Sequence, residues 1–186
     1  MACTLSAAGV PGAPGAPGAP PLIQPTASPR QVVNSPTKGP EVPHHPGPAS
    51  VELPATMVQS LVDHARAEYP NEMCGVIVGD RPAAVGGVPL RWEPTRNQAA
   101  SPLRYEIHPD DLLRLTIETE NAGEEFWAIV HSHTHSPPRP SLTDVGLAFY
   151  PDAIFLLVSL AEDEPALAAW RIVDGEIHLV ELIVGH

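Results

Sequence analysis

The chain has 186 residues and 24 prolines, and twelve of these prolines lie in residues 1–50, a segment without Phe, Trp or Tyr. Such a segment cannot bury enough apolar surface to offset the entropy of ordering it. The composition therefore predicts a disordered tail over 1–50 and one domain of ordinary size over 51–186.

The domain is strongly acidic. Only Arg30, Lys38 and Glu41 are charged before position 51, so 8 basic and 21 acidic residues remain and give a net charge of −13 with neutral histidine. The arginines of the domain are scattered, so it lacks the clustered basic patch that nucleic-acid binding needs. Binding to an anionic membrane surface is disfavoured for the same reason. Two cysteines, Cys3 and Cys74, make no disulfide framework, and no signal peptide or membrane-spanning run is evident. These features predict a cytoplasmic protein without nucleic-acid or membrane partners.

The first half of the domain alternates strands with one helix. Apolar residues at helical spacing predict a helix over 55–68, which Pro70 ends. Short apolar runs, separated by turn signals, predict three strands near 51–53, 74–78 and 88–92.

The second half is predicted to complete a mixed sheet. Pro109 begins a helix that ends near 121–123, and a second helix is predicted over 141–149. The continuous apolar run 126–130 is typical of a central strand buried on both faces. Three further strands are predicted at 154–160, 168–173 and 177–184, the last two joined by an Asp-Gly hairpin turn. The fold class is therefore α/β (α+β), with helices on the faces of a mixed sheet.

One polar segment contains the candidate metal-binding residues. His131 and His133 follow the buried run directly, and residues two apart on a strand point the same way. Asp144 comes eleven residues after His133, and a proline-rich loop could return it to the histidines. Two histidines and one carboxylate suit a tetrahedral Zn²⁺ whose fourth position is left to water.

Simpler interpretations of the same residues exist. An isolated His-x-His is more often surface or core than ligand, and Ser141 with Asp144 could form only a helix cap. His135 continues the alternation and is a further candidate ligand, although two prolines follow it closely.

A hydrolytic zinc site also needs a base for its water. Glu72 is the candidate, because it precedes a buried strand that could lie beside the histidine strand. Cys74 could instead be a nucleophile, but a cysteine before glycine in a buried strand is more often a small core residue.

Glu72, His131-Ser-His133, Ser141 and Asp144 at this spacing resemble the JAMM signature of the MPN+ zinc metalloproteases. The resemblance covers essentially all of residues 51–186. It implies an MPN/JAB-like (cytidine-deaminase-like) domain with one Zn²⁺ per chain bound by His131, His133 and Asp144. It also implies that Glu72 is the general base and then acid, and that Ser141 supports the oxyanion.

The chain is most similar to the compact bacterial branch, the Mec-type peptidases. Thr134 replaces a proline found in many eukaryotic members, and only 58 residues separate Glu72 from His131, which leaves no room for the insertions that grip ubiquitin. The branch implies an activity in cysteine biosynthesis: release of cysteine from the C-terminal Gly-Gly of a ubiquitin-like sulfur-carrier protein, or trimming of residues after that pair. Asn97 and Thr134 are candidate substrate-binding residues, although an asparagine there could equally form a turn.

Three other hypotheses stay open from the sequence. They are a zinc hydrolase of another small substrate with His131, His133 and His135 as ligands, a non-catalytic MPN-type interaction module, and a metal storage or sensing protein. The edge strands of such a sheet also make a homodimer a further hypothesis.

Overall fold

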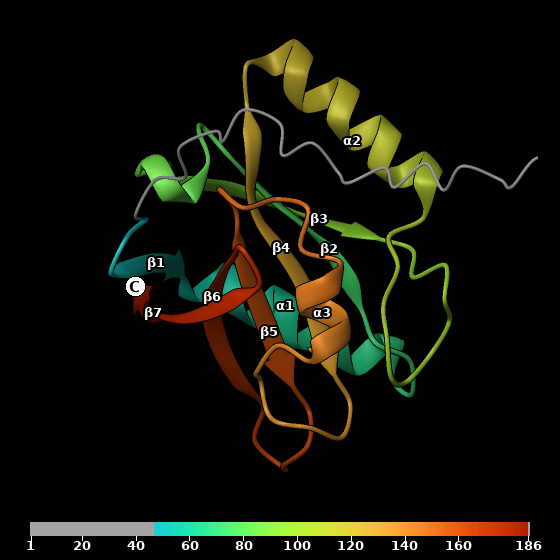
Figure 1. Ribbon diagram of the computed structural model, residues 1–186. Helices are drawn as coiled ribbons and strands as arrows, with labels where there is room; N and C mark the ends of the chain where they lie inside the picture. The colour runs from blue at the N-terminus through green and yellow to red at the C-terminus, as the bar shows by residue number, and fades with distance from the viewer. Residues whose placement is uncertain (1–46, 186) are drawn as a thin grey trace, which may run out of the picture. The chain divides into compact units, whose positions relative to one another are not determined.

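A seven-stranded mixed sheet forms the centre of the domain (Figure 1). The computed structural model describes residues 47–185. The strands follow the order β1-β7-β6-β5-β4-β2-β3, in which β1 pairs with β7 and β4 with β5 in parallel, while all other pairs are antiparallel. Their bounds are β1 Ser50–Pro54, β2 Cys74–Gly79, β3 Pro89–Thr95, β4 Glu125–His133, β5 Ile154–Ser159, β6 Ala166–Val173 and β7 Glu176–Gly185.

Helices cover both faces of this sheet. On one face, α1 (Ala55–Glu68) buries Leu61, Val62 and Ala65 against strand residues such as Ile77. On the other face, α2 (Pro109–Ala122) contributes Leu115 to a second apolar cluster, and Val145 of α3 (Leu142–Gly146) packs against the same cluster. Figure 1 shows α1 behind the sheet and α3 in front of it. A short 3₁₀ helix over Ala83–Val85 follows β2.

The register of the central strands brings polar residues that are far apart in the sequence together at one end of these strands. Strands β4 and β5 are parallel, so their carboxyl ends lie side by side. Strand β2 runs antiparallel to β4 and therefore begins next to the carboxyl end of β4. Cys74 lies opposite His131, and continuing this register by two residues sets Glu72 across from His133. Residues before β2 and at the end of β4 therefore share one neighbourhood.

The structure confirms the predicted α/β class and the type of each predicted element. Several predicted lengths differ from the structure, and two of these differences lie at the polar segment. β4 extends to His133 because β2 and β5 pair with its polar end. The helix predicted over 141–149 is only Leu142–Gly146, because Asp144 is its one buried residue and Phe149 is 75 % exposed, so little packing supports a longer helix.

Other predictions concern the ends and edges of the domain. The predicted tail lies almost wholly outside residues 47–185. None of the helices in that described part is long and apolar enough to cross a membrane. β1 and β3 are the two outer strands of the sheet, and a homodimer through them stays a prediction.

Candidate metal centre

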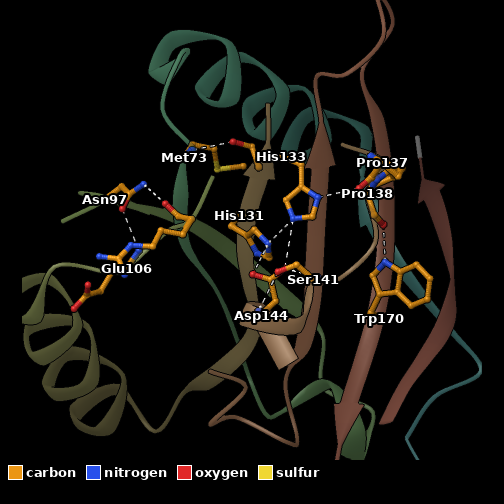
Figure 2. A network of polar contacts seen from close by, with 12 residues as sticks. Met73, Asn97, Glu106, His131, His133, Pro137, Pro138, Ser141, Asp144 and Trp170 are labelled. Atoms are coloured by element: carbon orange, nitrogen blue, oxygen red, sulfur yellow. Dashed lines mark hydrogen bonds and ion pairs between the residues drawn. The ribbon is translucent and has the colours of Figure 1, made fainter. Parts of the chain in front are cut away.

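His131, His133 and Asp144 converge at the carboxyl end of β4 (Figure 2). The Nε2 atoms of the two histidines are 3.3 Å apart. The carboxylate of Asp144 reaches both rings, with Oδ1 3.4 Å from His131 Nε2 and Oδ2 3.5 Å from His133 Nε2. All three residues are buried.

These distances fit a tetrahedral metal ion. Ligand atoms bound to Zn²⁺ at about 2.0–2.1 Å in tetrahedral geometry lie about 3.3–3.4 Å from one another. The three distances between the side chains are close to that value. The donor set of two imidazole nitrogens and one carboxylate also matches the open type of zinc site, in which three protein ligands leave the fourth position free.

Each histidine is oriented by a different neighbour. His133 Nδ1 lies 2.8 Å from the carbonyl oxygen of Pro137, which fixes the proton on Nδ1 and leaves the Nε2 lone pair facing the other ligands. His131 stacks on the ring of Tyr105, with centroids 4.3 Å apart and an interplanar angle of 19°. Burial lowers the pKa of His131, which favours its neutral, metal-binding form.

The pKa of His133 moves in the opposite direction. Burial acts to lower it, but the hydrogen bonds to Asp144 and to the Pro137 carbonyl outweigh burial and raise it. For Asp144, burial acts to raise the pKa, yet the contacts with the two histidines and with Ser141 leave it lowered. Asp144 is therefore held as a carboxylate, the form that binds a metal ion.

A capping box places Asp144. The Ser141 hydroxyl accepts a hydrogen bond from Asp144 N at 3.2 Å, and Asp144 Oδ2 accepts one from Ser141 N at 2.6 Å. The two interpretations of this pair, helix cap and metal site, therefore describe the same residues.

Glu72 lies in the same cleft as these residues. The cleft has a volume of about 250 Å³, and its walls include Glu72, His133, Ser141 and Asp144. Glu72 is 4 % exposed, and burial raises its pKa from 4.5 to about 7, a shift that His133 opposes and Asp144 reinforces. A carboxyl group with this pKa can take up and return a proton near neutral pH.

Two alternatives from the sequence do not fit this arrangement. His135 is exposed and is not among the three residues that converge, so the set of three histidines is not assembled. Cys74 is fully buried, its Sγ lies 3.3 Å from Thr95 Oγ1, and burial raises its pKa to about 11. A thiol of this kind is a poor nucleophile at neutral pH.

Asn97 and Thr134 are bound to other parts of the protein. The Asn97 amide donates to the carbonyl oxygens of Glu72 (2.9 Å) and Arg104 (3.2 Å), and its oxygen accepts from the backbone of Ala99 and Glu106. Substrate binding through Asn97 would require one of these bonds to break.

Thr134 links the end of β4 to the loop after β3. Its hydroxyl donates to Pro102 O at 2.8 Å and therefore accepts from His135 Nδ1. Thr134 is also part of the cleft lining, together with Pro102 and Leu103.

Sequence reasoning missed three contributors to the site. They are the ring of Tyr105 under His131, the Pro137 carbonyl on His133, and Trp170, whose Nε1 donates to Pro138 O at 2.8 Å (Figure 2). The contacts of the two backbone carbonyl groups cannot be predicted from residue types, because every residue carries such a group. The Pro137-Pro138 pair was the only signal, because consecutive prolines fix the path of that loop.

Comparisons with known proteins agree with this geometry. Residues 54–173 match the family described as prokaryotic homologs of the JAB domain. The chain is 38 % identical over 128 residues to the CysO-cysteine peptidase of Mycobacterium tuberculosis, a match that covers 66 % of this chain and 83 % of that protein. It is 33 % identical over 114 residues to the desampylase of Haloferax volcanii, covering 59 % of this chain and 80 % of the relative.

Solved structures share the fold. A protein of Desulfitobacterium hafniense, 29 % identical, matches with a TM-score of 0.65 over 73 % of this chain and 92 % of its own. A protein of Salinibacter ruber, 27 % identical, matches with a TM-score of 0.54 over 72 % of this chain and 90 % of its own.

Proposed function

Because the chain belongs to the family of prokaryotic homologs of the JAB domain, we propose that it is a zinc-dependent peptidase. Its substrate is an amide bond that follows the C-terminal Gly-Gly of a small ubiquitin-like sulfur-carrier protein. The observation that carries the proposal is the convergence of His131, His133 and Asp144, of which His133 and Asp144 line the cleft that also holds Glu72. The catalytic unit comprises residues 51–186, and residues 1–50 supply none of these groups.

One Zn²⁺ per chain would be held by His131, His133 and Asp144. When bound, the ion supplies Lewis acidity, which makes a water molecule acidic enough to attack near pH 7 and polarises the scissile carbonyl. The donor set and the distances of 3.3–3.5 Å between the ligand atoms support this assignment.

Glu72 moves the proton. It removes a proton from the attacking water, whose oxygen forms a bond to the carbonyl carbon, and it returns that proton to the leaving nitrogen as the C–N bond breaks. The pKa of about 7 supports both halves of this exchange. The Ser141 hydroxyl would donate a hydrogen bond to the carbonyl oxygen and stabilise the negative charge that develops there.

The shape of the cleft and the names of the relatives support the choice of substrate. The cleft is small, with a volume of about 250 Å³, and glycine residues without side chains would fit a small cleft. Pro102, Leu103 and Thr134 would line the path of this tail. The relatives named CysO-cysteine peptidase and desampylase support a ubiquitin-like protein as the partner.

The test is direct cleavage by the zinc-loaded full chain. We expect a carrier protein that ends in Gly-Gly-Cys to lose one cysteine residue, as measured by mass spectrometry. A second arm offers the same carrier linked through its terminal glycine to a lysine side chain. A zinc-loaded protein that leaves both substrates intact would contradict the proposal.

The Glu72→Gln variant tests the proton path. We expect it to retain one zinc per chain and to lose about 10²–10⁴ in rate, the usual contribution of a general acid–base. Thr119→Val, which removes a buried hydroxyl on α2, serves as the control and should cleave at the native rate. Near-native turnover by Glu72→Gln would contradict the role of Glu72.

A further inference from the structure

The residue between the two histidines makes a contact that the metal site does not explain. Ser132 is fully buried, and its side chain points to the opposite face of β4 from His131 and His133 because neighbouring residues alternate. Its hydroxyl oxygen accepts a hydrogen bond from Met73 N at 2.8 Å. Met73 directly follows Glu72, so this bond is one residue away from the proposed base.

This bond completes the hydrogen-bonded pair of Met73 and Ser132, which continues the pairing of β2 with β4 by one residue. Ser132 N donates to Met73 O at 3.0 Å, which is one half of an antiparallel pair. In a regular pair the two residues exchange both backbone bonds, so Met73 N would donate to the backbone carbonyl of Ser132. Here the Ser132 side chain is the acceptor. Without its hydroxyl, a buried N–H beside Glu72 would lose its partner.

The backbone of Glu72 itself is held from the other side. Its N–H donates to Ser101 O at 2.9 Å, and its carbonyl accepts from the Asn97 amide at 2.9 Å. Both of these bonds come from the loop that follows β3. Ser132 therefore supplies the side-chain bond from β4, the strand that carries the two histidines, to the segment that carries the base.

We propose that Ser132 is a positioning residue that holds Glu72 at a fixed place relative to His131 and His133. The inference rests on the proposed role of Glu72 as the base. Ser132 touches neither substrate nor metal. It acts by fixing the backbone of residues 72 and 73 against the strand on which the metal ligands lie.

The first test measures the hydrogen bond between Met73 and Ser132 and does not depend on peptidase activity. In Ser132→Ala, amide hydrogen exchange of residues 71–74 should become at least about tenfold faster than in the wild type, in the zinc-loaded and in the metal-free protein alike. Ser132→Thr keeps an oxygen at the same position and should restore slow exchange. Unchanged exchange in Ser132→Ala would overturn the inference.

The second test measures the consequence for catalysis. We expect Ser132→Ala to keep one zinc per chain and a native KM, but to lose roughly 10- to 100-fold in kcat, because a misplacement of about 1 Å can cost about 10² in rate. Ser132→Thr should recover most of this loss, and Thr119→Val should lose nothing. A native kcat in a Ser132→Ala protein that exchanges faster would overturn the positioning role.

The outcomes separate this inference from the proposed function. If the wild-type protein cleaves neither carrier substrate, the proposed function fails, and the exchange measurement still decides whether Ser132 holds the segment. If the wild type cleaves a carrier and Ser132→Ala loses zinc together with activity, Ser132 supports the metal site and the inference is wrong.

Discussion

The two walls of the cleft are built in different ways. The wall that carries Glu72 is tied to the sheet and to the loop after β3 by four hydrogen bonds between distant parts of the chain, and all of them involve backbone groups. The wall that carries Asp144 is a five-residue helix, and the two hydrogen bonds that place the carboxylate and the helix start run between Ser141 and Asp144 themselves.

This difference separates two requirements of a hydrolytic site. A base must stay at a fixed distance from the reacting atoms, so a rigid position on the sheet suits it. A metal ligand on a short helix gains its final restraint from the metal, because metal binding and local folding are coupled. The comparison predicts that loss of the Asp144 ligand affects metal content, whereas changes at Ser141, which caps the same helix, and on the Glu72 wall affect rate or stability.

The largest effect is expected for Asp144→Asn. This change keeps the shape of the side chain but weakens the ligand, so the affinity for zinc should fall by more than about 100-fold, beyond the effect of losing an outer partner of a ligand. Zinc content after dialysis against a weak chelator measures this loss. His135→Ala is the control, because that exposed residue lies outside the convergent set and should keep one zinc per chain. Loss of zinc in His135→Ala and its retention in Asp144→Asn would favour the three-histidine hypothesis.

Ser141→Ala tests the same wall without removing a metal ligand. The variant should keep its zinc and lose about 10²–10³ in rate, because one donor to the oxyanion is removed. It should also lower the free energy of unfolding by about 0.5–2 kcal/mol through loss of the cap. Steady-state kinetics and thermal unfolding separate the two effects. Ser141→Thr keeps both cap and donor, and a rate as low as that of Ser141→Ala would contradict the donor role.

The same contrast explains which parts of the site the sequence could predict. His131 and His133 were predictable because alternation along a strand fixes their common direction, and Asp144 because Ser141 at that spacing signals a helix start. The partners of the Glu72 wall were not, because a contact such as Ser132 with Met73 depends on the register between strands 59 residues apart. Asn97 was singled out, but its four backbone partners could not be read from its position.

The length of the helix that carries Asp144 shows a further limit. Sequence reasoning extended it to residue 149 and passed over Gly146, although glycine is a common residue at helix ends. The structure ends it at Gly146, where exposed side chains such as Leu142 and Phe149 find no surface to cover them. Helix type follows from local signals, but helix length depends on tertiary packing that one sequence does not reveal.

The smallest predicted effect concerns the loop behind the Glu72 wall. Asp111, in the first turn of α2, accepts hydrogen bonds from the backbone and the guanidinium of Arg96, and these bonds lower its pKa from 3.8 to about 2. The folded protein therefore binds this proton less readily than the unfolded chain does. The stabilisation is fully present above a pH of about 4 and is lost as the pH falls through about 2.

Asp111→Asn should consequently lower the melting temperature by only a few degrees at pH 7, since Arg96 is largely exposed and solvent weakens the ion pair. The difference from the wild type should shrink as the pH approaches 2. Thermal unfolding at several pH values measures it, and Arg114→Gln, which breaks an exposed pair with Glu118 on α2, is the matched control. Because Ser132 also holds the backbone of Met73, which directly follows Glu72, kcat should remain native in Asp111→Asn. A large loss of kcat at pH 7 would show that the loop after β3, and not the bond from β4, fixes the base.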